Sequence, residues 1–591
     1  MKLSDYVALY LKEKNIKYIF GIIGSANSHL VDSISRLGFT KIVYTHHEQA
    51  AVIAAGSYYR ATGNLAIALV TAGGGSSNAV TGVLSQWADS TPCIIFAGQE
   101  NVKQLNDDIN SRLFGTQGFN FCQVVENMTK FAHSLREKNQ IKFFLDKAFY
   151  ESMSGRPGPV WLEFPADVQN AQIDLPNLEI YDKQELDYDS YDIKELIEII
   201  NQSSKPVLVC GNGVRLSKSN EILKKILNDL NIPAVTSWSG IDVLEYEHKN
   251  NFGTFGIYGQ RCANFVLQNC DLLIVLGSRL SVQQTGYNIN DFAPLAKIIM
   301  VLNDKKELSK HDRYYLKYFD DCNNFLQKFY KEQKNLTKNF TSWYEKCVSI
   351  KKDYPLIESH HIEDNRTYDN SYVFINSISK LAKNQIIAIG QGSPLPCCHQ
   401  AFEISENQIM FASNGLGEMG HGLPSAVGCA FNDQGKDVIL MDGDGSMMMN
   451  LQELQTIVGY NLPIKIFIFN NQGYLFIKHT QKLLFNGRYF GVDDKSGMTL
   501  PSFKKISEAF NIPYFSSKEN SIADFLEIKG YGIYECFMNP EQDLTPKVKP
   551  IANETGMIPM PLHEMSPLVD IHELESIMEI TLSEKSYEIR K

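Results

Sequence analysis

The sequence predicts an α/β protein with three consecutive doubly wound parallel-sheet domains and a C-terminal tail. Short apolar, β-branched runs alternate with segments of helical periodicity along most of the 591 residues, a pattern typical of parallel sheets covered by helices. A chain of this length is expected to form about three or four domains. Residues 173–192, rich in Asp, Glu and Tyr and without clear periodicity, predict the first linker.

Each domain is assigned from its own apolar runs. The first domain is predicted over residues 1–175, with strands at 18–23, 42–45, 66–71, 93–97 and 160–164 and a helix at 48–61. The second, at 190–345, has apolar runs at 205–211, 271–277 and 298–302, and the third, at 365–540, has strands at 385–389, 438–442 and 464–470. The charged stretch 303–365 is expected to be a solvated helix plus linker. The tail, 541–591, shows one helix, at 572–581.

The composition excludes several classes of protein. A hydrophobic fraction of 44% argues against a disordered chain, and a net charge of −11 argues against a general nucleic-acid binder. The sequence has neither a signal-peptide core nor an apolar run of about 18 residues. Eleven scattered cysteines indicate reduced thiols, and we therefore expect a cytoplasmic protein without membrane association. His399 beside Cys397-Cys398 could suggest a metal site, but no C-x-x-C partner supports it.

The strongest motif is Gly443-Asp444-Gly445-Ser446, directly after the apolar strand at 438–442. One helix and one strand later the chain reaches Asn470-Asn471, so a β-α-β crossover would return Asp444 and Asn471 to the same sheet edge. Two oxygen donors beside glycine backbone suit Mg²⁺ carrying a diphosphate, and the following helix offers free N–H groups to the anion. Asp-Gly and Asn-Asn also favour plain turns, but the paired spacing favours the metal–diphosphate interpretation.

Gly415-Leu416-Gly417-Glu418-Met419-Gly420 matches the dinucleotide pattern G-x-G-x-x-G. Ser413 and Asn414 interrupt the continuity of strand and turn, and no clear acidic strand end follows about 20 residues later. The motif alone therefore argues weakly for a nucleotide-binding oxidoreductase, which remains an alternative.

The first domain contributes a second candidate site. His46-His47-Glu48 opens an Ala-rich helix, where a Glu ordinarily satisfies the helix dipole. The glycine-rich loop Thr71–Asn78 would allow a ligand to approach the backbone closely.

Taken together, the motifs resemble those of thiamine-diphosphate-dependent enzymes of the acetolactate synthase type, also called the pyruvate oxidase group, over roughly residues 1–540. The matching segments are His47–Ala51, Thr71–Asn78, Gly155–Val160, Gly415–Gly420 and Gly443–Asn471. The resemblance implies a pyrimidine-binding domain, a middle domain and a diphosphate-binding domain in this order, with the tail as a candidate active-site lid.

The resemblance also implies roles for single residues. Glu48 would be catalytic, bonding the aminopyrimidine ring of the cofactor and promoting its nucleophilic form. The Gly417 carbonyl would accept from the 4′-amino group, and Met419 would wedge between the two rings. Mg²⁺ would be held by Asp444, Asn471 and the Gly473 carbonyl. The remaining cofactor-binding residues would be Gln391, Gly392, Gly443, Gly445, Ser446 and Tyr474.

The implied reactants are a small 2-oxo acid and a carbonyl acceptor. Candidates for lining their pocket are Asn27, His29, His46, Asn120 and Phe476. In this family Glu48 faces the diphosphate half across a subunit interface, which implies a homodimer or homotetramer.

Several departures from the family pattern limit what carries over. Acetolactate synthases of amino-acid biosynthesis have G-x-V-x-Q-W-Q after the Asn pair, whereas residues 473–481 contain no Trp, and Asn120 stands in place of a usual active-site Gln. Gly277-Ser278-Arg279 is retained where relatives place flavin contacts, but Val301-Leu302-Asn303-Asp304 replaces an acidic strand end. The replaced strand end argues against FAD binding in the middle domain. Because Gly277-Ser278-Arg279 is retained, FAD stays a possible cofactor. Residues 473–481 and 561–568 look more like acetolactate-synthase-like enzymes of bacterial surface-sugar pathways.

The expected function is therefore decarboxylation of a 2-oxo acid with transfer of the activated aldehyde to an acceptor. A simple decarboxylase that releases the aldehyde is the alternative within the same class. A non-catalytic subunit that binds cofactor for assembly is the alternative from another class, although Glu48, Asp444 and Asn471 are all retained.

Overall fold

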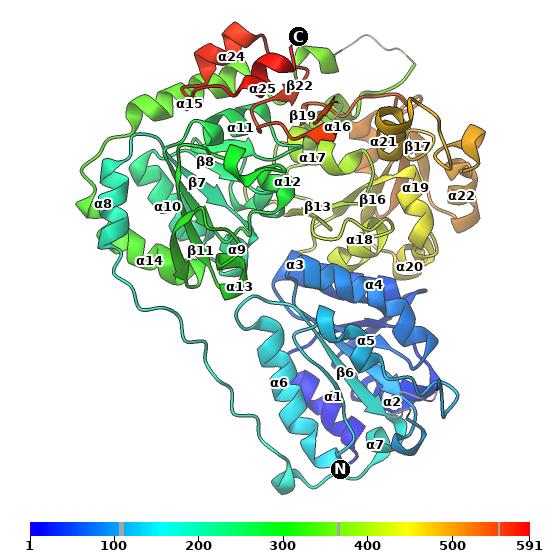
Figure 1. Ribbon diagram of the computed structural model, residues 1–591. Helices are drawn as coiled ribbons and strands as arrows, with labels where there is room; N and C mark the ends of the chain where they lie inside the picture. The colour runs from blue at the N-terminus through cyan, green and yellow to red at the C-terminus, as the bar shows by residue number, and fades with distance from the viewer. Residues whose placement is uncertain (106–111, 363–366, 554–555, 591) are drawn as a thin grey trace. The chain divides into compact units, whose positions relative to one another are not determined.

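The computed structural model describes residues 1–105, 112–362, 367–553 and 556–590. In these residues the chain forms three α/β regions, each built on a six-stranded sheet (Figure 1). This confirms the predicted fold class. The predicted start of the third domain, residue 365, lies outside the described residues.

The first sheet has the strand order β2-β1-β3-β4-β6-β5, with all neighbours parallel. Its strands are β1 (Tyr18–Gly21), β2 (Lys41–Tyr44), β3 (Ile67–Val70), β4 (Cys93–Gln99), β5 (Ala132–Ser134) and β6 (Pro159–Pro165). Its helices are α1 (Leu3–Glu13), α2 (Ser28–Leu37), α3 (Glu48–Thr62), α4 (Gly74–Ala88), α5 (Phe121–Val125), α6 (Ile141–Met153) and α7 (Ala166–Asn170). Helix α3 is apolar on almost every face because it is buried almost all round.

The second sheet has the order β12-β11-β10-β7-β8-β9, again parallel throughout. Its strands are β7 (Pro206–Cys210), β8 (Ala234–Thr236), β9 (Asn251–Thr254), β10 (Leu272–Leu276), β11 (Lys297–Leu302) and β12 (Tyr314–Phe319). Its helices are α8 (Lys194–Gln202), α9 (Asn212–Leu216), α10 (Asn220–Leu230), α11 (Arg261–Gln268), α12 (Val282–Thr285), α13 (Lys305–Leu308), α14 (Cys322–Glu332) and α15 (Thr341–Asp353).

The interpretation of residues 303–365 as solvated helix plus linker was wrong. Strand β12 forms an edge of the second sheet, and α14 buries Phe325, Leu326 and Phe329 in the core. The apolar stripe of α14 was not recognised because the polar residues Gln327 and Lys328 lie between Leu326 and Phe329.

The third sheet has the order β14-β13-β15-β16-β18-β17, in which β13, β15, β16, β18 and β17 pair in parallel. The strands are β13 (Ile386–Ile389), β14 (Met410–Ala412), β15 (Val438–Gly443), β16 (Ile464–Asn470), β17 (Tyr514–Ser516) and β18 (Gly532–Phe537). The helices are α16 (Ser371–Leu381), α17 (Pro394–Ala401), α18 (Gly422–Ala430), α19 (Asp444–Met447), α20 (Glu453–Tyr460), α21 (Leu475–Phe485), α22 (Phe503–Phe510) and α23 (Ile522–Glu527).

The tail forms two short antiparallel pairs and two helices. The pairs are β19 (Lys547–Val548) with β22 (Met565–Ser566) and β20 (Ile551–Asn553) with β21 (Gly556–Ile558), and the helices are α24 (Ile571–Ile577) and α25 (Glu584–Glu588). Helix α11 binds the tail: Arg261 donates to the carbonyls of Met565 and Pro567, and Asn264 donates to that of Leu562. The lid role of the tail stays a prediction.

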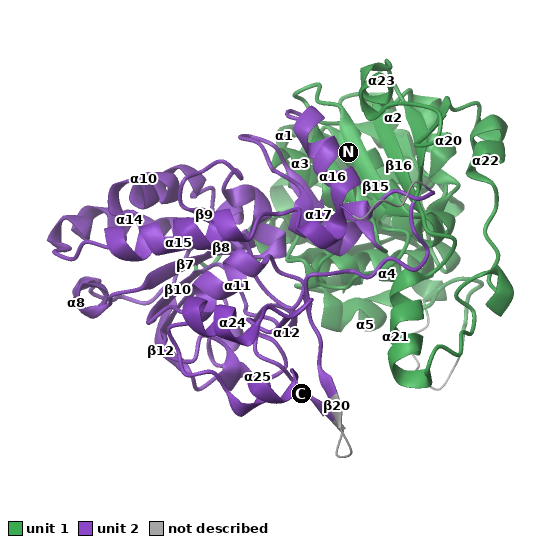
Figure 2. Ribbon diagram, turned by 90° about the horizontal axis from the view of Figure 1, so that it is seen from above, with its two compact units in different colours: residues 1–186, 385–392, 412–537 green, residues 187–384, 393–411, 538–591 purple. Residues whose placement is uncertain are grey.

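The chain divides into two compact units (Figure 2). The first comprises residues 1–186, 385–392 and 412–537, and the second comprises residues 187–384, 393–411 and 538–591. All eleven cysteines are free thiols, and all except Cys122 are buried. Across the described ranges, no helix is long and apolar enough to cross a membrane.

Candidate active site

Asp444 lies at the carboxyl edge of the third sheet. Strand β15 ends at Gly443, and Asp444 begins helix α19 with only 1% of its surface exposed. Its Oδ1 accepts from the Gly445 N–H at 2.7 Å, and its Oδ2 accepts from the Gly473 N–H at 3.1 Å. Asn471, which is 3% exposed, follows the neighbouring parallel strand β16. The predicted metal ligands therefore gather at one edge of the sheet.

The electrostatics of this edge fit a divalent cation. Burial raises the pKa of Asp444 to about 7, although the N–H bonds from Gly445 and Gly473 act in the opposite direction. In the described part of the chain no Lys, Arg or His forms an ion pair with Asp444. Asp444 supplies a buried carboxylate, and Asn471 and Gly473 follow the neighbouring strand; their amide and carbonyl groups are oxygen donors of the kind that Mg²⁺ accepts.

The predicted diphosphate residues lie around the same strand ends. The Gln391 N–H donates to Asp442 Oδ1 at 3.0 Å, and the Gly443 N–H donates to the Gln391 carbonyl at 3.0 Å. Ser446 Oγ accepts from the Gly420 N–H at 3.0 Å. Gly392, next to Gln391, has a φ of +99°, a conformation that favours glycine.

Asp442 belongs to the same motif, but no role was predicted for it from the sequence. Its side chain is fully buried and accepts from two backbone N–H groups, those of Gln391 and Gly443. Burial raises the pKa of Asp442 to about 7. An acid at the end of an otherwise apolar strand, directly before Gly443, was the signal that could have identified it.

Gly445 has no room for a side chain. A Cβ at Gly445 would lie 2.2 Å from the ring of Tyr474, which is half-buried at the start of α21. The backbone N–H of Tyr474 donates to the Val492 carbonyl, which also faces Gly473. Gly445, Gly473 and Tyr474 are thus packed as one group beside Asp444.

Glu48 meets the first turns of helix α4, which begins at Gly74, so most of the predicted glycine-rich loop Thr71–Asn78 is helical. It opens α3 and is 7% exposed, with His47 as the helix N-cap. Asn78 Nδ2 donates to Glu48 Oε2 at 3.0 Å, and a Cβ at Gly75 would lie 3.0 Å from Oε1. The predicted catalytic carboxylate and the glycine-rich start of α4 are therefore neighbours.

Comparison with known proteins gives matches over most of the chain. Three family models match: "Thiamine pyrophosphate enzyme, N-terminal TPP binding domain" at residues 1–143, "central domain" at 193–329, and "C-terminal TPP binding domain" at 390–535. A probable acetolactate synthase large subunit from Methanocaldococcus jannaschii is 30% identical over 525 residues, covering 87% of each chain. The chain belongs to the thiamine-diphosphate-dependent enzymes of the acetolactate synthase type.

Two bacterial relatives extend the match. The acetolactate synthase large subunit of Haemophilus influenzae is 28% identical over 535 residues, covering 86% of this chain and 88% of its own. The isozyme 2 large subunit of Escherichia coli is 28% identical over 567 residues, covering 94% and 99%. The comparisons confirm the resemblance inferred from the motifs and make this chain a thiamine-diphosphate-dependent enzyme of the carboligase type.

In this acetolactate synthase-type enzyme, helices α3 and α18 pack in opposite directions. Ser57 donates to Ser425 at 3.0 Å, while a Cβ at Gly428 would lie 2.1 Å from the Ala54 carbonyl oxygen. Farther along α3, Arg60 donates to the Ala412 carbonyl just before the Gly415–Gly420 loop.

Glu48 begins the same helix twelve residues before Arg60, which corresponds to about 18 Å of helix. The structure therefore places Glu48 at the opposite end of α3 from the loop of its own chain.

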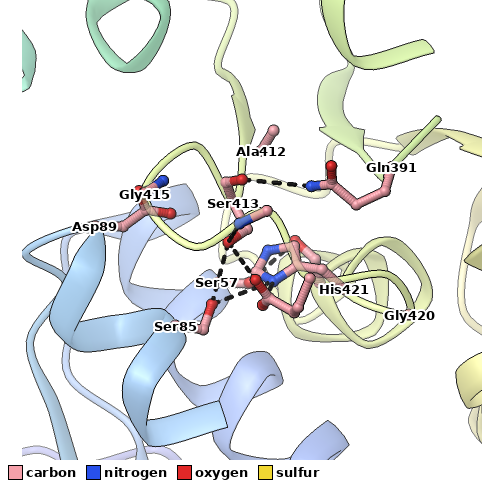
Figure 3. A network of polar contacts seen from close by, with 12 residues as sticks. Ser57, Ser85, Asp89, Gln391, Ala412, Ser413, Gly415, Gly420 and His421 are labelled. Carbon is pink, nitrogen blue, oxygen red and sulfur yellow. Dashed lines mark hydrogen bonds and ion pairs between the residues drawn. The ribbon is translucent and has the colours of Figure 1, made fainter. Parts of the chain in front are cut away.

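The loop itself carries the other predicted cofactor contacts. Gly417 has a φ of +74°, and Met419 is half-buried. Glu418 Oε1 lies 2.8 Å from His421 Nδ1, and Ser413 Oγ donates to Glu418 Oε2 at 2.5 Å (Figure 3). These bonds fix both sides of Met419.

The five candidate substrate residues lie in different settings. Asn27 is fully buried and bonds three backbone groups, the carbonyls of Ile22 and Val70 and the N–H of Gly24. His29 lies 3.2 Å from Lys2 Nζ, and burial together with Lys2 lowers its pKa. The other three are His46, which is exposed, Asn120, which caps α5, and Phe476, which is half-buried in α21. Their substrate roles stay predictions.

Proposed function

We propose that the chain decarboxylates a 2-oxo acid and transfers the activated aldehyde to a carbonyl acceptor, using thiamine diphosphate and Mg²⁺. The observation that carries the proposal is the gathering of Asp444, Asn471 and Gly473 at one sheet edge, in a chain that aligns with acetolactate synthases along most of their length. A diphosphate and its Mg²⁺ need such a set of oxygen donors and glycine backbone.

Mg²⁺ would be held by Asp444, Asn471 and the Gly473 carbonyl, and the diphosphate would lie at Gln391, Gly392, Gly443, Gly445 and Ser446. When bound, the cofactor supplies the electron sink that decarboxylation requires. The chain's own residues hold and orient it. Asp442 fixes the Gln391 and Gly443 amides, and Glu418 with His421 fixes the loop that carries Gly417 and Met419.

Glu48 would hold a proton at the aminopyrimidine ring. Asn78 orients Oε2 of its carboxylate, and Gly75 leaves the space beside Oε1 free of a side chain. Because only 7% of Glu48 is exposed, little water competes for its oxygens. A positioned proton donor or acceptor of this kind typically contributes about 10²–10⁴-fold to a rate.

Glu48 would act in the site of a second copy of the chain. Its place at the far end of α3 from the Gly415–Gly420 loop supports this arrangement, because one chain alone leaves the two halves of the site apart. A homodimer, or a pair of dimers in a homotetramer, would complete both sites. Light scattering of the purified enzyme measures which assembly forms, and a monomer with full activity would contradict the arrangement.

The reaction is tested by product analysis with pyruvate or 2-oxoglutarate, with and without aldehyde and keto-sugar acceptors. A ligated product is expected, and Glu48→Gln serves as the inactive control. Release of aldehyde in every reaction would instead support a simple decarboxylase. Cofactor binding without turnover of any acid would support a non-catalytic subunit.

A keto-sugar acceptor is included because residues 473–481 lack the Trp of the biosynthetic enzymes and look more like the surface-sugar group. FAD is not required for the proposed reaction. In the middle domain Asp304, at the end of β11, accepts from the Lys306 and Glu307 N–H groups and so caps α13. The departures from the family pattern in the middle domain support a chain without flavin, and flavin absorbance of the purified protein would contradict it.

A further inference from the structure

Asp89 holds the start of the Gly415–Gly420 loop of its own chain. It follows helix α4, and only 7% of its side chain is exposed. Its Oδ1 accepts from the Gly415 N–H at 2.7 Å, and its Oδ2 accepts from the Asn414 N–H at 3.2 Å (Figure 3). A carboxylate of the first domain thus binds two consecutive amides of the third.

Arg60 completes this contact from helix α3. Its Nη1 lies 3.4 Å from Asp89 Oδ2 and donates to the Ala412 carbonyl at 3.0 Å, and only 7% of its side chain is exposed. Burial raises the pKa of Asp89, while the Arg60 guanidinium and the Gly415 N–H act in the opposite direction. Since a buried carboxylate is costly without partners, the pair and the two amides depend on one another.

The backbone of the loop fits tightly against α4. A Cβ at Gly415 would lie 2.6 Å from the Ala88 carbonyl oxygen, so this position accepts no side chain without displacement. Ser85 Oγ lies 3.4 Å from Ser413 Oγ and 3.5 Å from His421 Nδ1. The first domain therefore contacts the loop before and after Met419.

We propose that Arg60 and Asp89 are positioning residues that hold the cofactor-contacting loop of their own chain. The inference rests on the proposed function, in which the loop presents Gly417 and Met419 to the cofactor. Each first domain would then serve two active sites: Glu48 acts in the site of the other copy, and Arg60 with Asp89 shapes the site of its own chain.

The first test compares Asp89→Asn and Gly415→Ala with matched controls. Asp146→Asn removes an acid that bonds Tyr10 and Lys142 within the first domain, and Gly459→Ala adds a methyl group where nothing lies within 4 Å. We expect kcat to fall about 10–100-fold in the two loop variants, as misplaced catalytic groups typically cause, with KM for the 2-oxo acid changed far less. The near-ultraviolet circular dichroism of the bound cofactor should also change.

The controls should keep the wild-type kcat and the wild-type cofactor spectrum. Folded Asp89→Asn and Gly415→Ala enzymes with kcat within twofold of wild type would overturn the proposal. Thermal melting confirms that each variant is folded, so a loss of activity without a loss of structure can be recognised.

The second test uses hybrid dimers, purified through two different tags after co-expression. A hybrid of Glu48→Gln with Asp89→Asn should regain about half of the wild-type activity, because one of its two sites has both residues intact. A hybrid of Asp89→Asn with Asp444→Asn should regain none, because each chain damages its own site. The reverse pattern would show that Asp89 acts on the other copy and would overturn the proposal.

A third hybrid separates this inference from the proposed function. Glu48→Gln with Asp444→Asn should regain activity wherever the sites are shared between copies, whatever Asp89 does. If this hybrid stays inactive, the proposal that Glu48 of one copy acts with Asp444 of the other copy is wrong. The kcat and the cofactor spectrum of the Asp89→Asn enzyme alone then decide whether Asp89 still positions the loop.

Discussion

The Oδ2 atom of Asp444 accepts a hydrogen bond from the backbone N–H of Gly473 at 3.1 Å. This contact joins the residue after β15 to the turn after β16, so the acid holds the N–H of Gly473, a residue whose carbonyl is itself a proposed metal ligand. Because Asp444 is 1% exposed and lacks a cationic partner among the described residues, its charge depends on the bound metal.

Mg²⁺ affinity should depend on pH through Asp444. Burial raises its pKa to about 7, so below that value a proton competes with the metal, and the Kd for Mg²⁺ should rise by up to about 10-fold per pH unit as the pH falls from 7 to 6. Titration calorimetry with thiamine diphosphate present measures this. Asp444→Asn should weaken Mg²⁺ binding at least about 10-fold and flatten the dependence, and an unchanged affinity would refute the ligand assignment.

Gly445→Ala should weaken cofactor binding. The new methyl group would meet the Tyr474 ring at 2.2 Å, so either the ring or the peptide at 445 must move. We expect the Kd for thiamine diphosphate to rise about 10-fold or more, corresponding to about 1.4 kcal/mol. Gly459→Ala, which has open space, is the control and should bind as the wild type does. Equal affinities for the two variants would contradict the packing argument.

Glu48→Gln should lower kcat about 10²–10⁴-fold while thiamine diphosphate still binds. The amide keeps the size of the side chain but cannot hold a proton as a carboxylate does. Steady-state kinetics and calorimetry on the same preparation separate turnover from binding. Glu126→Gln, an exposed position in the same domain, is the control. Turnover equal to that of the wild type would remove Glu48 from the mechanism.

His361 should make stability depend on pH. The Glu358 N–H donates to its Nδ1 at 3.0 Å, so the ring proton is on Nε2, which donates to the Thr545 carbonyl at 2.9 Å. Burial lowers the pKa of His361 from 6.5 to about 4. Between these values the unfolded chain binds more protons, so the contribution of His361 is complete above about pH 6.5 and is lost as the pH falls toward 4.

The contribution of His361 to the pH dependence is measured by comparing the free energy of unfolding of the wild type with that of His361→Gln. Relative to His361→Gln, wild-type stability should fall by up to about 3 kcal/mol between pH 7 and pH 4. Melting temperatures of both proteins across this range provide the test. His572→Gln, at an exposed position of α24, is the matched control. Parallel curves for wild type and His361→Gln would show that the ring is not held neutral.

The long apolar strands and the motifs at their ends were predictable. Strand β10 and the first four residues of β15 are fully buried, and their sequences are uninterrupted apolar runs. Short or polar strands were missed: β5 is Ala-His-Ser and half-buried, and β12 is a Tyr-rich edge strand interrupted by Lys317. Such strands form because their neighbours offer backbone partners, which a local pattern does not reveal.

The site was predictable where chemistry and spacing coincide, as at Asp444 and Glu48. The Arg60–Asp89 pair was not predictable, because its partners are backbone amides more than 300 positions away in the chain. Asn27 is a residue for which the sequence predicted a substrate contact and the structure shows a structural role. Its amide looked available for a ligand, but it bonds the backbone on three sides, an arrangement that only the folded loops create.

Helix α3 sets a fixed spacing between Glu48 at its start and Arg60 near its end. A single inserted residue between them would rotate one end by about 100° and move it by about 1.5 Å relative to the other. Under the proposed arrangement, such an insertion would disturb the proton-holding group of one active site and the loop support of another at once. The length of α3 thus fixes the positions of two residues that would act in different active sites. We therefore expect tolerated insertions to fall in the surface loops instead.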